Sequence, residues 1–551
     1  MRRSTPRSRD IRTIAIAATA AAALVLVPTG AAMAGGNGNG GAKASPAAKC
    51  DNRNNNTISK LLQCVDADGA TEHLDAFQAI ADENGGNRAA GLPGYEASVD
   101  YVVGVLEDAG WDVTIDEFDY TFIGASTLTQ LTPVNEEYPT GAFSGSGSGD
   151  VTGNVVPVDI NLVGDRASTS GCEASDFTGF PAGSIALVQR GSCNFGDKAY
   201  FAGLAGATAV IIFNQGNTPD REALIVADAS SRTDGSPVSH TIPIVGASFQ
   251  QGVALAASGS TANVFVPAPE QRPQKNVIAE KTGVNDDNVV MAGAHLDSVQ
   301  AGPGINDNGS GSAALLEIAE NLEKLKPQNT VRLAWWGAEE DGLLGSAAYV
   351  DGLSQAEKDR IALYLNFDMV ASPNYIFMAY DGDESGWAAP EGVPIPEGSV
   401  QIEDLFESYY TMVGEPYDDA QFSGRSDYEA FILNGIPAGG LFTGAEVVKT
   451  PEQADIWGGI AGESYDQCYH QACDDIDNID EHAFDVNVDA IALAVLAYAY
   501  STESVNGVAG VPVPGGLSLP APAGPEGTVN LPGGGGLAPD HGHDHGPRDA
   551  A

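Results

Sequence analysis

Apolar and polar positions follow two different periods in the second half of the chain. Short apolar runs alternate there with stretches in which apolar residues recur every three to four positions. The first pattern is typical of buried strands and the second of amphipathic helices. We therefore expect an α/β fold with a mostly parallel, twisted sheet and helices on both of its faces. The expected strands are 289–294, 331–336, 362–367, 375–379 and 438–442, and the expected helices are 312–325, 345–352, 400–413 and 484–500.

The first half of the chain contains two different sequence patterns. Helical spacing at 73–81 and 98–109, followed by a strand-like run at 113–118, matches the pattern of the second half. Between these parts the chain turns to short β-rich runs broken by Gly, Ser and Pro, which predicts an inserted β-rich domain. The expected ranges are 50–123 together with 273–503 for the α/β domain and 124–272 for the insertion.

Both ends of the chain differ from its interior. Five arginines precede an apolar stretch at 14–27 and the sequence Ala-Met-Ala at 32–34, which is the order of a signal peptide cleaved after residue 34. The apolar run is shorter than about 20 residues and ends at Pro28, which disfavours a membrane anchor, and no later segment is expected to span a bilayer. We expect residues 1–34 to be the signal peptide, 35–49 a flexible leader, and 504–551 a disordered tail rich in Pro, Gly and His.

The chain is strongly acidic, with a formal net charge of -48. Removal of the signal peptide takes away five Arg and one Asp and makes the charge -52. Because phosphates would repel such a surface, nucleic acid is excluded as a partner. We expect a secreted, extracellular monomer.

Six cysteines in an exported chain indicate disulfide bonds, although six cysteines allow 15 pairings. Each cysteine has one near neighbour in the sequence, so we expect neighbours to pair. The expected pairs are Cys50 with Cys64, Cys172 with Cys193, and Cys468 with Cys473.

Five potential metal ligands stand at the carboxyl ends of strand-like runs or in turns that follow them. A single catalytic zinc uses about three protein ligands, so two imidazoles and three carboxylates fit a pair of zinc ions that share a bridging carboxylate. One such residue alone is more often a buried group with a structural partner, but five in these settings favour a metal-dependent hydrolase. The residues are His295, Asp307, Glu340, Asp368 and His470.

Two further carboxylates have expected roles beside these ligands. Glu339 directly precedes Glu340, and adjacent side chains at a strand end point in different directions, so Glu339 is the candidate general base. Asp297 lies two residues after His295 and is expected to accept a hydrogen bond from the second nitrogen of that imidazole.

These residues lie in blocks that follow a known order. The blocks are Gly-Gly-Asn-Arg-Ala-Ala-Gly-Leu-Pro-Gly-Tyr (85–95), 295–311, 335–340, 366–369, Gly-Arg-Ser-Asp (424–427) and 468–473. In this the chain resembles the M28 family of secreted dizinc aminopeptidases, which implies a fold of the zinc-exopeptidase type. The resemblance implies that His295 and Asp368 hold one zinc, that Glu340 and His470 hold the other, and that Asp307 bridges them. It also implies a cis peptide bond after Asp307.

The resemblance assigns further site residues. It implies that Tyr469 donates a hydrogen bond to the developing oxyanion, that Arg425 contacts the substrate carbonyl, and that Met369 and Phe442 line an apolar specificity pocket. One departure is visible, because Tyr428 stands where a compact member of the family has His. The resemblance also places a calcium ion between three carboxylates, although exposed helix carboxylates are the simpler interpretation; these are Asp66, Asp485 and Asp489.

The inserted region resembles a protease-associated (PA) domain. The runs that carry this resemblance are 184–195, 202–214 and 242–247. Such a domain either restricts access to the site or has no effect on catalysis, and the sequence leaves both open.

The expected reaction is removal of an N-terminal residue, with preference for Leu and similar side chains, from peptides and proteins. A carboxypeptidase or a glutaminyl cyclase of the same fold is the alternative enzyme. A carboxypeptidase needs cations for the terminal carboxylate, and Arg425 alone supports this weakly. A binding ectodomain without catalysis is the alternative from another class, and the complete ligand set argues against it.

Overall fold

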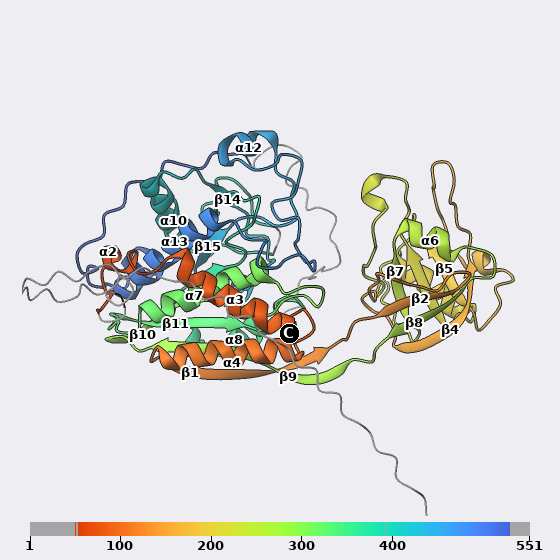
Figure 1. Ribbon diagram of the computed structural model, residues 1–551, viewed down its shortest axis with the longest axis horizontal. Coiled ribbons are helices and arrows are strands. Elements are labelled where there is room, and N and C mark those ends of the chain that lie inside the picture. Colours follow the sequence, from red (N-terminus) through yellow and green to blue (C-terminus); the bar gives the residue numbers. More distant parts are fainter. Residues whose placement is uncertain (1–49, 51–52, 391, 529–551) are drawn as a thin grey trace, which may run out of the picture. The chain divides into compact units, whose positions relative to one another are not determined.

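The computed structural model describes residues 50, 53–390 and 392–528 (Figure 1). The expected signal peptide, the expected leader and the last part of the expected tail lie outside the described residues.

An eight-stranded mixed sheet forms the larger part of the protein. Its four central strands, β11, β10, β12 and β15, are parallel to one another, while β1 and β9 form an antiparallel edge. The sheet confirms the expected α/β fold. In spatial order the strands are β1 (Asp112–Phe122), β9 (Glu270–Lys281), β11 (Asn329–Trp336), β10 (Asn285–His295), β12 (Ile361–Phe367), β15 (Ala438–Phe442), β13 (Met378–Tyr380) and β14 (Asp418–Ala420).

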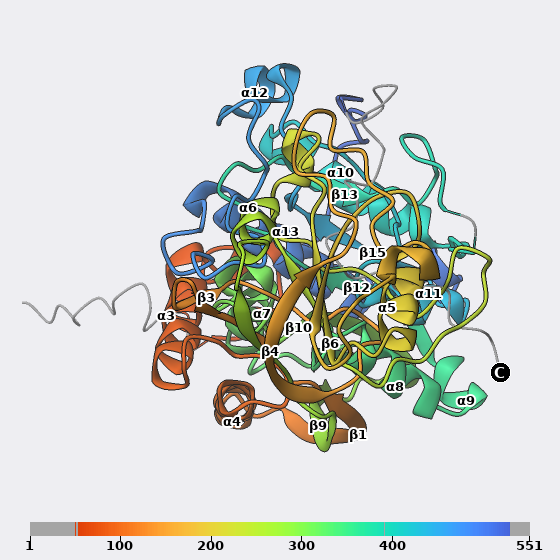
Figure 2. The ribbon, with the colours of Figure 1, turned by 90° about the vertical axis from the view of Figure 1, so that its right-hand side faces the viewer.

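Helices cover both faces of this sheet. Figure 2 shows α3, α4 and α7 on one side of the sheet and α8 and α11 on the other, in agreement with their contacts. The central strands are buried along nearly their whole length, as expected for a sheet covered twice. The helices are α2 (Ile58–Leu61), α3 (Ala67–Glu83), α4 (Pro93–Asp108), α7 (Ser310–Asn321), α8 (Leu344–Gly352), α9 (Gln355–Lys358), α10 (Ser399–Val413), α11 (Tyr428–Leu433), α12 (Pro451–Trp457), α13 (Glu481–Tyr500) and α14 (Glu503–Asn506).

Helix α13 packs against α7 and the central strands β10 and β11. Among the described residues it is the one helix long and apolar enough to cross a membrane, so the expectation that no later segment passes that test was wrong. Its most apolar stretch is 83% buried within the protein. This burial is typical of a core helix in an α/β fold.

The expected disorder of residues 504–551 was wrong for residues 504–528. The N–H groups of Gly527 and Thr528 and the Thr528 hydroxyl donate hydrogen bonds to the buried carboxylate of Asp418, and Glu526 N–H donates to the Tyr417 carbonyl. Val513 is buried as well. Low hydrophobicity hid this docking because it depends mainly on backbone hydrogen bonds rather than on an apolar core.

A seven-stranded sheet lies within the range expected for the insertion. Two sets of apolar side chains, one on each face, form its cores. In spatial order the strands are β3 (Glu136–Tyr138), β2 (Thr127–Thr132), β8 (Thr261–Val266), β4 (Gly149–Pro157), β5 (Ile185–Gln189), β6 (Ala209–Phe213) and β7 (Ile244–Ala247), with helices α5 (Phe195–Leu204) and α6 (Phe249–Leu255) and short 3-10 turns η1 (Ala174–Phe177) and η2 (Pro219–Arg221).

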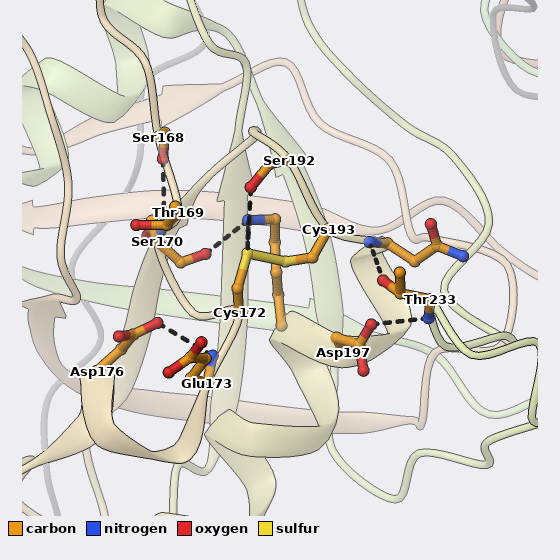
Figure 3. The surroundings of a disulfide bond; sticks show 12 residues. Ser168, Thr169, Ser170, Cys172, Glu173, Asp176, Ser192, Cys193, Asp197 and Thr233 are labelled. Carbon is orange, nitrogen blue, oxygen red and sulfur yellow. Dashed lines mark hydrogen bonds between the residues drawn. A yellow bond between two sulfur atoms is a disulfide. The ribbon is translucent and has the colours of Figure 1, made fainter.

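All three expected disulfides are present. Cys172–Cys193 joins the segments that flank β5, and Figure 3 shows it beside Ser192 and the start of α5. The bonds Cys50–Cys64 and Cys468–Cys473 close shorter loops. Three disulfides among the described cysteines indicate an extracytoplasmic location, because reducing compartments seldom keep them.

Candidate metal centre

Five of the predicted site residues meet at the carboxyl edge of the parallel strands. His295 ends β10, Glu339 and Glu340 follow β11, and Asp368 follows β12. Asp307 lies in the short turn η3 (Ile305–Gly309), which leads into α7. Neighbouring parallel strands end at the same edge of a sheet, so the topology brings these side chains together.

Asp307 lies between the two imidazoles. Its Oδ1 is 3.2 Å from Nε2 of His295, and its Oδ2 is 3.3 Å from Nε2 of His470. The peptide bond between Asp307 and Asn308 is cis, as expected. One carboxylate therefore presents one oxygen to each imidazole.

The donor atoms divide into two groups around Asp307. In the first, His295 Nε2 is 3.3 Å from Asp368 Oδ1 and 3.8 Å from Glu339 Oε2. In the second, His470 Nε2 is 3.0 Å from Glu340 Oε2. Within each group the donor atoms lie within 4.8 Å of one another, with Asp307 in the second.

Several donor atoms in these groups make no hydrogen bond within the protein. His295 Nε2, Glu340 Oε1 and Asp368 Oδ1 are buried and make no hydrogen bond. A buried polar atom without a partner is costly, and native proteins keep few of them. Imidazole nitrogens and carboxylate oxygens are ligands that zinc accepts. The residues present therefore fit a pair of zinc ions.

Electrostatics support the same fit. Burial raises the pKa of the Glu340 carboxyl to about 7 and that of the Glu339 carboxyl well above its usual range. Burial lowers the pKa of the two imidazoles, but the facing carboxylates outweigh it and raise both well above the usual value. Four carboxylates this close need positive charge nearby, which bound cations would supply.

Asp297 has a different role from the expected one. The nearest acceptor to Nδ1 of His295 is the Asp297 backbone carbonyl at 3.1 Å, and the carboxylate is farther away at 3.7 Å. The carboxylate accepts hydrogen bonds from the N–H groups of Glu339, at 3.1 Å, and Glu340, at 3.4 Å. Asp297 therefore fixes the backbone that carries the pair of glutamates.

Sequence reasoning missed three residues that hold the site in place. Ser426 donates a hydrogen bond of 2.6 Å to Oδ2 of Asp368. Asp474 accepts from the N–H of Asp307, and buried Arg88 donates to the carbonyls of Pro303 and Gly304, just before the η3 turn, and of Leu296, just after His295. Their signal was present, since Arg88 and Ser426 lie inside the blocks 85–95 and 424–427 that carry the family resemblance, and Asp474 follows Cys473.

His470 lies inside the small loop closed by Cys468 and Cys473. Its φ angle of 56° is in the left-handed region, which non-glycine residues adopt at a cost. The ring of Tyr469 stacks on its imidazole with 3.8 Å between centroids. The Tyr469 hydroxyl is 3.4 Å from Nη2 of Arg425, whose Nη1 bonds Glu446 at 2.8 Å.

A cavity of about 260 Å³ opens beside the two groups. Met369 and Phe442, both expected in the specificity pocket, line it, as do Tyr469 and Arg425. Tyr428 lines it too; its hydroxyl accepts a hydrogen bond from Gly424 N–H. Of the candidate ligands, Asp307 and Asp368 line this cavity, together with Glu339.

The expected calcium ligands lie near one another but serve other contacts. Asp66 caps helix α3 by accepting from Gly69 N–H, and Asp485 accepts from Ala67 N–H. Burial raises the pKa of Asp489 to about 7, and Asp485 adds to this effect. Calcium at this place stays a prediction.

A parallel α/β sheet with paired imidazoles and carboxylates at its carboxyl edge defines a metallopeptidase of the zinc-exopeptidase type. A model of peptidase family M28 matches residues 276–495, and a model of the PA domain matches residues 151–255. The chain belongs to peptidase family M28 and carries a PA domain. The predictions of an M28 aminopeptidase and of an inserted PA domain are confirmed.

The chain is similar over most of its length to several aminopeptidases. It is 47% identical over 455 residues to an aminopeptidase of Pseudomonas aeruginosa (strain UCBPP-PA14), covering 81% of this chain and 83% of that one. It is 41% identical over 454 residues to a probable leucine aminopeptidase 2 of Aspergillus fumigatus, covering 81% and 86%. The solved structure of a zinc aminopeptidase from Bacillus subtilis superposes with a TM-score of 0.57 at 26% identity, covering 78% and 94%. A zinc-dependent enzyme is consistent with these relatives and with the donor atoms of the site.

Proposed function

We propose that the chain is a secreted dizinc aminopeptidase that removes N-terminal residues, preferentially Leu and similar apolar ones, from peptides. The observation that carries the proposal is the position of Asp307, with one oxygen toward His295 and the other toward His470. A single metal would leave one of these two imidazoles without a use. The proposed signal peptide lies outside the described residues.

In this proposal Asp307 is the shared ligand of both ions. His295 and Asp368 complete one site, and Glu340 and His470 complete the other. When bound, two zinc ions would polarise the scissile carbonyl and make water a nucleophile near neutral pH.

Glu339 is the proposed general base. Its carboxylate lines the cavity next to the first group, and the hydrogen bond from its own N–H to Asp297 fixes its backbone. As the water oxygen attacks the carbonyl carbon, Glu339 takes one proton from the water. It then passes this proton to the nitrogen of the leaving amine as the C–N bond breaks.

Two other side chains are proposed to orient the substrate carbonyl. The Tyr469 hydroxyl donates a hydrogen bond to the oxyanion as it develops. Arg425 lies within 3.4 Å of that hydroxyl and contacts the carbonyl from the same side. The disulfide loop limits how far Tyr469 can move.

Substrate preference follows from the side chains that line the cavity. The carboxylates of Asp368 and Glu339 are among them and suit the charged α-amine of a peptide. Met369 and Phe442 suit an apolar side chain. Among the described residues that line the cavity, Arg425 is the only basic one, and Glu446 already pairs with it. This argues against a carboxypeptidase.

The test is metal analysis beside a leucyl-anilide assay. We expect two zinc ions per chain, hydrolysis of leucyl-anilide, and no hydrolysis of the matched N-acetyl-leucyl-anilide, which lacks the charged amine. Hydrolysis of the acetylated substrate at the same rate would overturn the exopeptidase proposal. Full activity with a single metal would overturn the bridged pair.

A further inference from the structure

A second group of carboxylates surrounds the loop that follows β13. Two of them, Asp381 and Asp383, lie in the loop sequence Asp-Gly-Asp-Glu-Ser-Gly at 381–386. The others come from elements packed around the loop: Glu403 and Glu407 from α10, and Asp419 from β14. None of them is a candidate ligand of the metal centre described above.

The oxygens of this group converge. One carboxylate oxygen each from Asp381, Asp383 and Glu403 lies within 4.8 Å of the other two, and the same holds for Glu403, Glu407 and Asp419. Glu403 belongs to both sets and joins them. Four of the five residues are buried, and Asp383 is exposed at the mouth of the group.

This negative charge has no basic partner. Within the described part of the chain, none of the five carboxylates forms an ion pair with Lys, Arg or His. Burial raises the pKa of Glu403 to about 9 and those of Glu407 and Asp419 to about 7, and the neighbouring carboxylates add to each shift. The group would thus hold protons unless a cation replaces them.

Asp419 gives an independent sign of a ligand. Its side chain is only 1% exposed, and its Oδ1 is buried without any hydrogen-bond partner. The other oxygen, Oδ2, faces the loop, and Ser385 Oγ lies 3.4 Å from it. A Cβ atom added to Gly386 would collide with the same oxygen. An unsatisfied buried carboxylate oxygen inside such a group is a ready ligand for a cation.

The loop has the ligand spacing of a calcium-binding loop. Calcium loops of the EF-hand type place oxygen ligands at positions 1, 3 and 5 and glycine at position 6, which are Asp381, Asp383, Ser385 and Gly386 here. The bidentate glutamate of position 12 is missing, since Gly392 stands there. Glu403 from α10 lies beside Asp381 and Asp383 and takes that place in space.

We propose that this group binds one calcium ion, held by Asp381, Asp383, Ser385, Glu403 and Asp419, with Glu407 at its edge. All the ligands are oxygens, which suits a hard cation and not zinc, and the site is separate from the one expected at Asp66. The ion joins the loop to α10 and β14. Because Trp387 and Asp419 also line the substrate cavity, calcium fixes one wall of that cavity.

Terbium, which replaces calcium in oxygen sites, provides the test on the full zinc-loaded chain. Trp387 donates a hydrogen bond to the Asp419 carbonyl, so its indole is close enough to sensitise terbium emission. We expect emission that calcium displaces. Calcium is titrated from about 10 µM to about 10 mM, which spans sensor and extracellular sites.

Matched variants assign the signal to this site. Asp383→Asn should weaken calcium binding at least about tenfold, whereas Asp404→Asn, the same charge change on helix α10 beside Glu403, should leave it unchanged. Asp485→Asn combined with Asp489→Asn should also leave it unchanged. Equal calcium affinity in Asp383→Asn and the unchanged chain would overturn the proposal, as would terbium emission lost only in the Asp485 and Asp489 variant.

A second measurement keeps the proposal testable if Asp383→Asn folds poorly. Calcium should raise the Tm of the unchanged chain but not that of Glu403→Gln, which cannot become a charged ligand and keeps the shape of the side chain. Without calcium, Glu403→Gln should melt at the same or a higher temperature than the unchanged chain. No calcium effect on the Tm of the unchanged chain would overturn the proposal.

Discussion

The two sheets of this protein both contain parallel strands that end in polar side chains, but these side chains differ in how completely they are hydrogen-bonded. In the PA sheet, Gln189 ends β5; its amide donates to the carbonyls of Asn161 and Gln215 and accepts from Asn161 N–H. After β6, Asn214 donates to the Ala223 carbonyl and accepts from Gln215 N–H. Every polar atom of these two amides has a partner within the same domain.

In the eight-stranded sheet, some polar atoms at the corresponding strand ends have no hydrogen-bond partner. His295 at the end of β10 and Asp368 after β12 each keep a buried atom that makes no hydrogen bond, as does Glu340 after β11. Both sheets contain neighbouring parallel strands, so parallel strands alone do not make a site. What distinguishes the site is buried polar atoms that the protein itself does not satisfy. The same criterion points to Asp419 in the proposed calcium site.

The largest expected effect is a difference between substitutions of two neighbouring glutamates that follow β11. Glu339→Ala should lower kcat by about 10²- to 10⁴-fold, because it removes the general base, and should leave the metal content near normal. Glu340→Ala should lower the metal content itself, because it removes a ligand. Kinetics with leucyl-anilide beside metal analysis measures both.

The reverse outcome would exchange the two roles. If Glu339→Ala lost metal and Glu340→Ala kept it, the two glutamates would have been assigned in the wrong order. Full activity in Glu339→Ala with both metals bound would remove the proposed base altogether.

The next effect concerns the buried charge of the PA domain. Lys198 donates a hydrogen bond of 2.6 Å to the Ser170 carbonyl, and burial lowers its pKa to about 8. Below pH 8 both the folded and unfolded chains hold the proton, so the full cost of burying the charge is present. Between about pH 8 and 10.5 the unfolded chain binds more protons, so stability should rise with pH, by up to about 3 kcal/mol.

Lys198→Met is the comparison for this pH dependence. The Tm of the unchanged chain minus that of the variant should increase from pH 8 to pH 10, while any effect of the lost hydrogen bond stays constant. A difference that is flat over this range would mean that the pKa of Lys198 is not lowered.

A smaller effect on stability is expected at Gln189, whose side-chain amide is fully hydrogen-bonded in the PA sheet. Gln189→Leu keeps a similar volume but leaves the N–H and carbonyl of Asn161 and the carbonyl of Gln215 without their partner. Asn161 is only part-buried, so water can replace its partner, whereas the Gln215 carbonyl stays buried and unpaired. One buried group left unpaired costs about 1 to 3 kcal/mol, so the free energy of unfolding should fall by about that amount while kcat stays unchanged. Denaturant unfolding beside the anilide assay checks both, and a fall in kcat without a change in stability would contradict the structural role.

The smallest expected effect compares two disulfides. Replacing Cys468 and Cys473 with Ser should lower kcat by about tenfold but change the Tm little, because a loop with a sequence separation of 5 restricts little unfolded-state entropy. The matched change at Cys172 and Cys193, with a separation of 21, should lower the Tm more than kcat. Unchanged kcat in the first variant would show that the loop does not position Tyr469.

Much of the fold follows from local patterns. The expected strand 331–336 lies within β11, and the expected helix 400–413 is one residue shorter than α10. The least accurate element is the expected strand 375–379, because β13 is only Met378–Tyr380 and its short length carries little periodicity. Residues 504–528 were missed because backbone hydrogen bonds to another part of the chain leave no trace in composition.

The sequence by itself determined the family, the order of the elements and the identity of the candidate ligands, because these depend on residue types and their spacing along the chain. Only the tertiary structure showed that the two oxygens of Asp307 face two different imidazoles, which lie 12 residues before it and 163 residues after it. It also showed that the Asp297 carboxylate accepts a hydrogen bond from the backbone N–H of Glu339 rather than from the imidazole of His295. Such choices depend on distances between groups far apart in the chain, and these distances exist only after the strands have packed side by side.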